Sequence, residues 1–440
     1  MVARASLAET VGVVAGIVVP LVARGLIVRR PRMTALQQRL DVDARAVRRL
    51  QRLRRRYGPG PLRLRIPGRS MAVVLDAGDA RRVLEESPVP FSPATREKTA
   101  ALRHFQPHAV LITDPPQRPG RRALNERVLE PGRCHHLGEH FARVAGEEVD
   151  ALLADAGEGA VVGHSELVPA YWRTVRRVVL GDGARDDTLV TDLLRSLRQD
   201  ANWAYFKPRR DRVRARFDAE LARHLARAEP RSLATLLPSD EVARGQVPHW
   251  LFAFDAAAIA LVRATALLAA HPAELAAVQR EADGGEREDG VPQHARAAVL
   301  EALRLWPTTP AVLREASEAT RWATGTLPAG TSFFTYAPFL HRDDERLASA
   351  NSYDPSLWFG RPAVGNWPFV PFSAGPAGCP GRELVLLVTG EFLSRLVAAR
   401  GLEPVAVAGV REGAVLPGTL DPFRLRVRLT APRTAPLAAV

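Results

Sequence analysis

Apolar positions with helical spacing run through most of the middle of the chain. The spacing predicts helices across residues 118–227, with a break of glycine and aspartate at 181–187. A longer apolar stretch predicts one helix over 248–270, which a His-Pro pair ends. Two further helices are predicted, at 293–305 and at 382–399. The core of the protein should therefore be helical.

Short alternating stretches lie on either side of this helical region. Residues 62–66 and 71–75 are typical of two strands around a Pro-Gly turn, and a helix is predicted behind them at 79–86. Residues 324–336 predict a second strand-rich patch, and the alternation of residues 402–429 predicts a third. The pattern therefore predicts a mainly α fold with a small β-rich lobe.

Composition narrows the setting of this fold. Apolar residues make up 46% of the 440-residue chain, which suits one large globular unit. The chain has two cysteines, Cys134 and Cys379, so no disulfide framework is expected. We expect the protein to reside in a reducing compartment such as the cytoplasm. The formal charge of +13 attracts anionic partners, and charge alone does not choose among an acidic protein, a lipid headgroup and a nucleic acid.

The N-terminal segment, residues 1–32, is first apolar and then basic. Residues 11–28 are apolar apart from Arg24, and an arginine-rich stretch follows them. The two interpretations are a helix packed on the body of the protein and a helix that contacts the cytoplasmic surface of a membrane. Nucleic-acid binding is not expected, because no aromatic residues interleave the arginines. Residues 33–440 should form one domain.

A glycine-rich loop places Cys379 directly before the helix predicted at 382–399. The loop reads Phe-Ser-Ala-Gly-Pro-Ala-Gly-Cys-Pro-Gly from Phe372 to Gly381. Helix-start amides and the positive end of a helix dipole lower the pKa of a thiol, and the glycines let the backbone turn tightly. We therefore expect a stabilised thiolate at Cys379.

The loop resembles the Phe-x-x-Gly-x-x-x-Cys-x-Gly signature of the cytochrome P-450 family, with its residues at Phe372, Gly375, Cys379 and Gly381. The resemblance implies the cytochrome P-450 fold, haem b as cofactor, and Cys379 as the axial ligand of the haem iron. Phe372, Gly375 and Gly381 would belong to the cofactor-binding loop. Ala377 departs from the family, whose members usually carry Arg or His there to meet a haem propionate.

The resemblance implies further cofactor-binding residues. The segment from Asp114 to Arg122 is similar to the bacterial family motif Asp-Pro-Pro-x-His-x-x-x-Arg, with Arg118 in the place of the histidine. Arg314 resembles the propionate-binding arginine of the family. The guanidinium groups of Arg118, Arg122 and Arg314 would hold the two propionates and offset the loss at Ala377.

Glu301 and Arg304 resemble the Glu-x-x-Arg element of the family, and a separation of three residues places both side chains on one helix face. The segment 341–343, His-Arg-Asp, looks like the family's His-Arg-Asp-Pro turn. Leu357 stands where the family places an arginine that completes a triad with the pair. Either Arg361 substitutes for that arginine, or the pair is satisfied locally.

Asp255 and Ala256 align with the family's acid-Thr pair, which delivers protons during oxygen activation. Ala256 replaces the threonine, and Thr265 lies about 14 Å further along the helix. Three routes stay open: a substrate hydroxyl or water linked to Asp255, peroxide as the oxidant, or a rearrangement that needs no dioxygen. Asp255 is either a proton relay or a buried, hydrogen-bonded acid.

The resemblance implies an oxidoreductase, most simply a monooxygenase of a small organic molecule with secondary-metabolite-like or lipid-like character. A ferredoxin or flavoprotein would donate electrons at the arginine-rich face near Cys379. The alternatives are a peroxide-using or rearranging haem-thiolate enzyme, and a non-catalytic haem-binding protein. The expected substrate contacts are Phe105, His108, Phe252, Ala256, Thr309 and Val312.

A second group of potential metal ligands is Cys134, His135, His136 and His140. These are ligand types of zinc sites. No second pair of ligands follows at the spacing that structural zinc sites use, so a polar helix start is the preferred interpretation.

Overall fold

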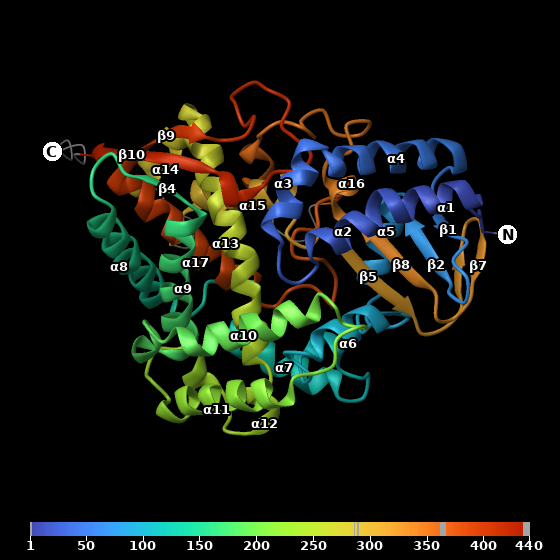
Figure 1. Cartoon of the computed structure of the whole chain (residues 1–440), viewed down its shortest axis with the longest axis horizontal. Coiled ribbons are helices and arrows are strands. Elements are labelled where there is room, and N and C mark those ends of the chain that lie inside the picture. Colours follow the sequence, from blue (N-terminus) through green and yellow to red (C-terminus); the bar gives the residue numbers. More distant parts are fainter. Residues whose placement is uncertain (1, 286, 288–289, 361–366, 434–440) are drawn as a thin grey trace.

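The computed structural model describes residues 2–285, 287, 290–360 and 367–433. Figure 1 shows a helical lobe and a smaller lobe in which helices cover a sheet. The N-terminus lies at the outer edge of the sheet lobe, and the C-terminus lies at the opposite end of the molecule.

Helices form most of the described chain. In its first half the α-helices are α1 (Leu7–Val13), α2 (Val19–Arg24), α3 (Pro31–Arg39), α4 (Val42–Tyr57), α5 (Ala77–Glu85), α6 (Arg96–Leu102), α7 (Arg118–Leu129), α8 (Gly138–Ala156), α9 (His164–Leu180), α10 (Thr188–Ala201) and α11 (Asp211–Arg227). In its second half they are α12 (Glu241–Arg244), α13 (Val247–Ala270), α14 (Pro272–Ala282), α15 (Gln293–Leu305), α16 (Ala337–His341) and α17 (Arg382–Ala399). A π-helical turn, η1 (Val14–Val18), joins α1 to α2. The short 3-10 turns are η2 (Val110–Ile112), η3 (Asp182–Ala184), η4 (Leu233–Leu236), η5 (Pro355–Trp358) and η6 (Pro422–Arg424).

The strands of the described chain form three sheets. They are β1 (Pro61–Arg63), β2 (Met71–Val74), β3 (Phe91–Ser92), β4 (Val161–Gly163), β5 (Ala311–Ala316), β6 (Thr320–Trp322), β7 (Gly325–Leu327), β8 (Ser332–Tyr336), β9 (Arg400–Ala406) and β10 (Arg426–Pro432). The largest sheet has the order β1-β2-β8-β5-β3, and β2 and β8 are parallel. The others are β4-β10-β9 and the hairpin β6-β7.

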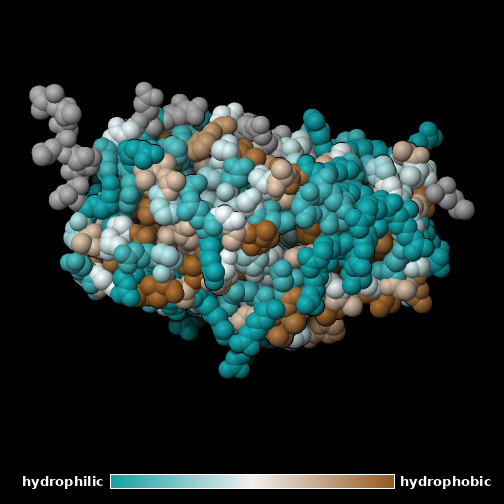
Figure 2. All heavy atoms as spheres, turned by 90° about the horizontal axis from the view of Figure 1, so that it is seen from above, coloured by the Kyte–Doolittle hydropathy of each residue, from teal (hydrophilic) through white to brown (hydrophobic). Residues whose placement is uncertain are grey.

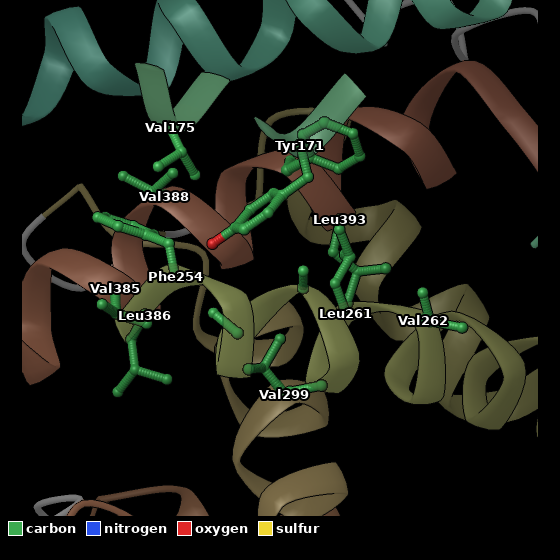
Figure 3. Packing of buried hydrophobic residues seen from close by; sticks show 14 of the residues in the cluster. Tyr171, Val175, Phe254, Leu261, Val262, Val299, Val385, Leu386, Val388 and Leu393 are labelled. Carbon is green, nitrogen blue, oxygen red and sulfur yellow. The ribbon is translucent and has the colours of Figure 1, made fainter. Parts of the chain in front are cut away.

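α13 crosses the middle of the helical lobe and is buried along most of its length. It packs against α9, α15 and α17, and Figure 3 shows Phe254, Leu261 and Val299 among the side chains that meet there. Because most of this helix has no face toward water, its sequence is apolar nearly all round rather than amphipathic. Burial is interrupted near its middle, where Phe252 and Asp255 are half-buried.

The segment of α1, η1 and α2 lies against the sheet lobe. Val13, Ile17 and Leu21 are buried in the core beside the sheet, and Arg4 forms a β-bridge with Arg63. The opposite side of the segment exposes the apolar side chains of Leu7, Val11, Val19 and Val22, and Leu26, two residues beyond it, is also exposed. The segment therefore packs on the protein with one face and leaves an apolar stripe on the other.

Two helical stretches of the described chain are long and apolar enough to cross a membrane, Leu7–Arg24 and Glu241–Ala270. In the second, 78% of the most apolar 18-residue window is buried in the centre of the helical core, so burial in the protein accounts for its apolarity. In the first, 28% is buried. Its apolar stripe is left without a partner among the described residues.

The predicted mainly α class is confirmed, and several helices begin and end where the sequence indicated. The helices predicted at 293–305 and 382–399 are α15 and α17, and the one predicted at 248–270 is α13, one residue longer. The two predicted strands pair as β1 and β2. The parallel pairing of β2 with β8, which joins distant parts of the chain into one sheet, was not predicted.

Candidate functional site

Cys379 lies in the loop that leads into α17, and glycine geometry shapes this loop. Gly375 has φ of +67°, and a Cβ on it would lie 2.1 Å from the carbonyl oxygen of Leu84. The N–H of Gly378 donates to the carbonyl of Gly375 (2.8 Å), and the N–H of Cys379 donates to that of Phe372 (3.0 Å). A side chain at Gly375 would therefore push the loop away from α5 and displace the cysteine.

The electrostatics of the thiol differ from the expectation. Burial raises the pKa of the Cys379 thiol, and the amide of Gly381 together with Arg122 and Arg382 offsets only part of this effect. The expected lowering by the helix start is present, through the amide of Gly381, but in the protein by itself burial outweighs it. A metal ion bound to the sulfur would reverse this balance, because thiols that coordinate a metal are deprotonated.

Two predicted arginines approach this region from different elements. Arg314 of β5 is 2% exposed, and it donates to the hydroxyls of Ser87 (2.8 Å) and Ser373 (3.0 Å), the second of which lies in the cysteine loop. Arg118 begins α7 and donates to the carbonyl of Val110 (2.5 Å). Among the described residues, neither guanidinium forms an ion pair with a carboxylate.

Lys98 of α6 is a third buried cation. Its ammonium donates to the carbonyls of Pro93 (3.1 Å) and Leu313 (2.8 Å). Burial lowers the pKa of Lys98 well below its ordinary value, and the charges of Arg314 and Arg118 lower it further. Burial and Arg118 likewise lower the pKa of Arg314 to about 9. These shifts mean that the three positive charges repel one another in a region of low polarity, which favours binding of an anion.

Arg122 is engaged differently. Its guanidinium donates to the carbonyl of Gly378 (2.6 Å) in the cysteine loop and forms an ion pair with Glu126 (2.6 Å). It therefore supports the loop from the side of α7. Its role in binding the cofactor directly stays a prediction.

Glu301 and Arg304 form a fully buried ion pair on α15. Both side chains are 0% exposed, with Arg304 Nη2 2.6 Å from Glu301 Oε1 and Nε 2.7 Å from Oε2. Arg304 donates its other N–H groups to the carbonyls of His341, Ser349, Ala350 and Ser352. Every donor of this guanidinium therefore has an acceptor.

Glu301 is satisfied without a second arginine. The amide of Asp354 donates to Oε1 (2.9 Å), and the indole N–H of Trp358 donates to Oε2 (2.9 Å). Leu357 at the expected arginine position therefore leaves no deficit at the carboxylate. Of the two alternatives, local satisfaction is present, and Arg361 lies outside the described residues.

His341 connects this ion pair to the chain that leads toward the cysteine. Its Nδ1 lies 3.2 Å from the carbonyl oxygen of Arg304, and its Nε2 accepts the N–H of Val370 (2.8 Å).

Two residues after His341, Asp343 accepts a hydrogen bond from Arg54 of α4 (3.0 Å). One arginine of the basic N-terminal stretch therefore belongs to the core, where a lipid cannot reach it.

The middle of α13 carries Phe252, Asp255 and Ala256. Asp255 forms an ion pair with Arg198 of α10, and the guanidinium carbon of Arg198 lies 4.9 Å from the centre of the Phe252 ring. Ala256 contributes no polar atom. The hydroxyl of Thr265 donates to a carbonyl of its own helix (2.9 Å). The acid is therefore present, held by a cation from another helix.

The expected substrate contacts fall into two groups. Phe105 and Phe252 meet edge to face with ring centres 5.4 Å apart, and Val312 is buried in β5. Thr309 is exposed and His108 is half-buried. The structure thus brings Phe105 against Phe252 of α13, and the contact of these residues and of Ala256 with a substrate stays a prediction.

The candidate zinc ligands serve as helix-start groups. Nε2 of His135 lies 3.0 Å from the carbonyl oxygen of Val128, and its Nδ1 accepts the N–H of Leu137 (3.0 Å). His136 pairs with Glu130 (2.8 Å). Glu130, His135 and His136 bring their ligand atoms within 4.8 Å of one another, but both ring nitrogens of His135 are already used. This supports the interpretation as a polar helix start.

Comparisons with known proteins agree on one family. The family model for cytochrome P450 matches residues 210–399. A cyclooctat-9-en-7-ol 5-monooxygenase of Streptomyces melanosporofaciens is 29% identical over 206 residues, which cover 44% of this chain and 45% of that protein. A probable cytochrome P450 4aa1 of Drosophila melanogaster is 33% identical over 109 residues, 24% of this chain and 21% of that protein. The matched segments thus span less than half the length of these curated relatives.

A solved structure extends the likeness to most of the chain. A zebrafish cytochrome P450 solved with progesterone has a TM-score of 0.70 and 19% identity, and the match covers 87% of this chain and 99% of that one. This likeness shows the fold. The fold and the cysteine loop define a haem-thiolate protein, and the chain belongs to the cytochrome P450 family. Membership implies haem iron as the cofactor.

The residues present fit such a group. The two propionates of a haem are carboxylates, and they would compensate the buried charges of Lys98, Arg118 and Arg314. Ala377 is 8% exposed and offers no side-chain donor to a propionate. Lys98, which the family pattern did not predict, supplies a cation in its place.

Three residues of the site were missed by sequence reasoning. Trp358 had a signal, because it follows Leu357 directly and is the aromatic residue of the same family segment. Lys98 and Arg198 had none, since a single cation in a helix is usually exposed. Their roles depend on residues far along the chain, Leu313 and Asp255 respectively.

We expect the stability of the protein to fall on acidification because of His341. Burial and the charge of Arg304 lower the pKa of His341 to about 3. The folded protein therefore keeps this ring neutral where the unfolded chain, with a pKa of about 6.5, takes up a proton. The free energy of unfolding should decrease by up to about 1.4 kcal/mol per pH unit as the pH falls from about 6.5 toward 3.

Chemical unfolding from about pH 7 to about pH 5 measures this effect. The variant His341→Gln does not titrate, so it should lose this part of the pH dependence, although it is less stable throughout. Equal slopes in the wild type and in His341→Gln would contradict the assignment.

Proposed function

We propose that this protein is a haem-thiolate oxidoreductase, most simply a monooxygenase of a small organic molecule, with haem b as its cofactor. One observation carries the proposal: the loop that holds the Cys379 thiol contacts the buried Arg314, and Arg314, Lys98 and Arg118 have no carboxylate partner among the described residues. A haem b brings an iron for the sulfur and two carboxylates for the cations. A cytokinin hydroxylase of Arabidopsis thaliana, 28% identical over 153 residues, supports the same reaction class.

Each group of the site has a defined role in this proposal. Cys379 holds the iron through its sulfur, and Arg122 keeps the cysteine loop in place through the carbonyl of Gly378. Lys98, Arg118 and Arg314 bind the propionates. The bound haem supplies the oxidising chemistry, which protein side chains do not provide.

Proton delivery is the step in which this chain departs from its family. Asp255 stands at the position of the acid in the acid-Thr pair of the family, and its carboxylate forms an ion pair with Arg198. The Asp255 side chain is 31% exposed, so water can reach it. Ala256 leaves space where a threonine would stand, and a substrate hydroxyl or an ordered water there would pass the proton on.

The side chains near the middle of α13 favour an apolar substrate. Phe105 and Phe252 contribute aromatic faces, Val312 an aliphatic one, and Ala256 a small one. A lipid-like or secondary-metabolite-like molecule gains free energy by burying apolar surface against them. We therefore propose a substrate of this class.

A small acidic redox protein fits the surface beside the cysteine loop. α7 reaches the cysteine loop through Arg122, which donates to the carbonyl of Gly378 (2.6 Å). Arg127 is exposed on α7, and Arg133 is exposed on the turn after it. Arg133 is paired with Glu130 (3.1 Å), so the charge of Arg127 would be the main attraction for an electron donor of the ferredoxin or flavoprotein class.

The proposed contact with a membrane surface uses the N-terminal segment. Figure 2 shows hydrophilic atoms over the region of α4 and hydrophobic atoms along the edge beside it, on the side where α1 and α2 lie in Figure 1. An apolar stripe next to exposed arginines is typical of helices that lie in the surface of an anionic bilayer. We propose a cytoplasmic protein that touches a membrane with this stripe.

The proposal is tested by the absorption spectrum of the reduced carbonyl complex. We expect the purified wild-type protein to give the spectrum of a thiolate-ligated haem, and Cys379→Ser to lose it completely. The chain offers its own control, because Cys134 is exposed and outside the loop, so Cys134→Ser should leave the spectrum unchanged. Purified protein without porphyrin, or an unaltered spectrum in Cys379→Ser, would rule the function out.

The role of Lys98 is tested by haem retention. Lys98→Met removes one of three charges that hold the propionates, and loss of a charge-assisted hydrogen bond costs about 1.5–3 kcal/mol, so transfer of haem to apomyoglobin should become about tenfold to a hundredfold faster. Lys98→Arg should restore most of the retention.

The same substitution at the other lysine is the matched control. Lys207 is half-exposed and paired with Asp200, so Lys207→Met should release haem at the wild-type rate. Equal rates in Lys98→Met and in the wild type would show that Lys98 does not bind the cofactor.

A peroxide-using enzyme of the same fold is the second candidate, and the absent hydroxyl at Ala256 together with the Asp255–Arg198 ion pair favours it. In that case peroxide should support oxidation of a panel of terpenes and fatty acids better than a reductase system does. Ala256→Thr should shift the balance toward the reductase system by at least about tenfold, whereas Ala253→Thr should not. Product formed with neither oxidant supply would exclude monooxygenation altogether.

A further inference from the structure

A second group of buried cations lies between α2, α3, α13 and the loop before β10, away from the cysteine loop. It surrounds a cavity whose lining includes Arg24, Arg29, Arg263, Asp43 and Trp306. α2 and α3 pass beside α13 here, as Figure 1 shows. The cavity thus lies where the N-terminal segment meets the central helix.

Asp43, the carboxylate in this lining, is fully engaged. Arg24 forms a bidentate ion pair with it (2.7 and 3.3 Å). The hydroxyls of Tyr336 (2.6 Å) and Thr419 (2.8 Å) donate to the same two oxygens. The negative charge of Asp43 is therefore matched by Arg24 and has little capacity left for another cation.

Arg29 and Arg263 have neutral partners. Arg29 donates to the carbonyls of Gly25 and Thr308, the second at 2.5 Å. Arg263 is 8% exposed and donates to the carbonyls of Trp306 (2.9 Å) and Leu420 (2.6 Å). No ion pair within the described parts of the chain includes either of them.

Some donors of this group also lack acceptors. The Nε atoms of Arg24 and Arg263 are buried and have no hydrogen-bond partner among the described residues. Burial and the neighbouring guanidinium groups lower the pKa of Arg29 and of Arg263 to about 9 each. Both stay charged at neutral pH, so the surroundings of the cavity carry unmatched positive charge.

The other nearby carboxylates do not remove this excess. Asp421 is paired with Arg424 at 3.7 Å, and burial raises its pKa, which favours the neutral acid. Asp255 attracts Arg29 at longer range but is in an ion pair with Arg198. At least one guanidinium charge therefore remains uncompensated.

We propose that this cavity binds one chloride-sized anion between Arg29 and Arg263. The cavity volume open to a water-sized molecule is about 20 Å³, which holds one water or one ion of that size. The ion would match the excess charge and join the N-terminal segment to α13, independently of any function at Cys379.

Thermal unfolding of the purified holoprotein tests the proposal. Chloride replaces gluconate at constant ionic strength, so that general screening is unchanged. At a hundredfold excess of chloride over its Kd, the Tm of the wild type should rise by about 3 °C. Arg29→Gln and Arg263→Gln should each lose this chloride dependence, and Arg45→Gln, at an exposed arginine of α4, should keep it.

A crystal soaked in bromide gives a second readout that needs no variant. We expect an anomalous peak between the guanidinium groups of Arg29 and Arg263. No chloride-specific rise in Tm in the wild type, a rise that both variants retain, or a cavity without bromide would overturn the proposal. An equal rise with acetate would overturn the assignment to a halide and show a carboxylate site in its place.

Discussion

Positive charge that leaves water must meet negative charge or a full set of acceptors, and this requirement governs the interior of this protein. A guanidinium keeps its proton at neutral pH even where burial lowers its pKa to about 9, so at that pH the chain does not relieve its burial by deprotonation. Arg304 shows the complete solution, with Glu301 for its charge and carbonyls for its other N–H groups. Residues 341–352 supply those carbonyls, and this stretch of chain is thereby held against α15.

The same requirement separates two kinds of buried cation in the described chain. Arg24 forms an ion pair with Asp43, so it stabilises the packing of the N-terminal helices on the sheet lobe. Arg314 donates hydrogen bonds to two serine hydroxyls and a carbonyl, and Lys98 donates to two carbonyls. These acceptors are neutral, so no negative charge among these hydrogen-bond partners balances either cation. The first kind serves the fold. The second kind marks the places where a ligand can complete the structure.

Local patterns were enough to predict the long helices and the cysteine loop. α17 begins at Arg382 because the glycine-rich turn and the apolar helix after it are adjacent in sequence. The partners of buried charges could not be predicted, because they are distant. Lys98 meets a carbonyl 215 residues further along, and Asp43 meets Tyr336 and Thr419 at separations of 293 and 376 residues. Such pairings depend on the assembled fold.

The ion pair between Asp255 and Arg198 also satisfies a charged group that is partly removed from water, at a site where Ala256 replaces the threonine of the family. A half-buried carboxylate without a neighbouring hydroxyl needs another donor, and α10 provides one from outside α13 because Ala256 cannot. The guanidinium also lies over the Phe252 ring, which itself packs on Phe105. A molecule that separates these two rings must therefore act on the contact that holds Asp255. If the substrate binds at the proposed contacts, its entry and the availability of that acid would be linked through Arg198, whichever oxidant is used.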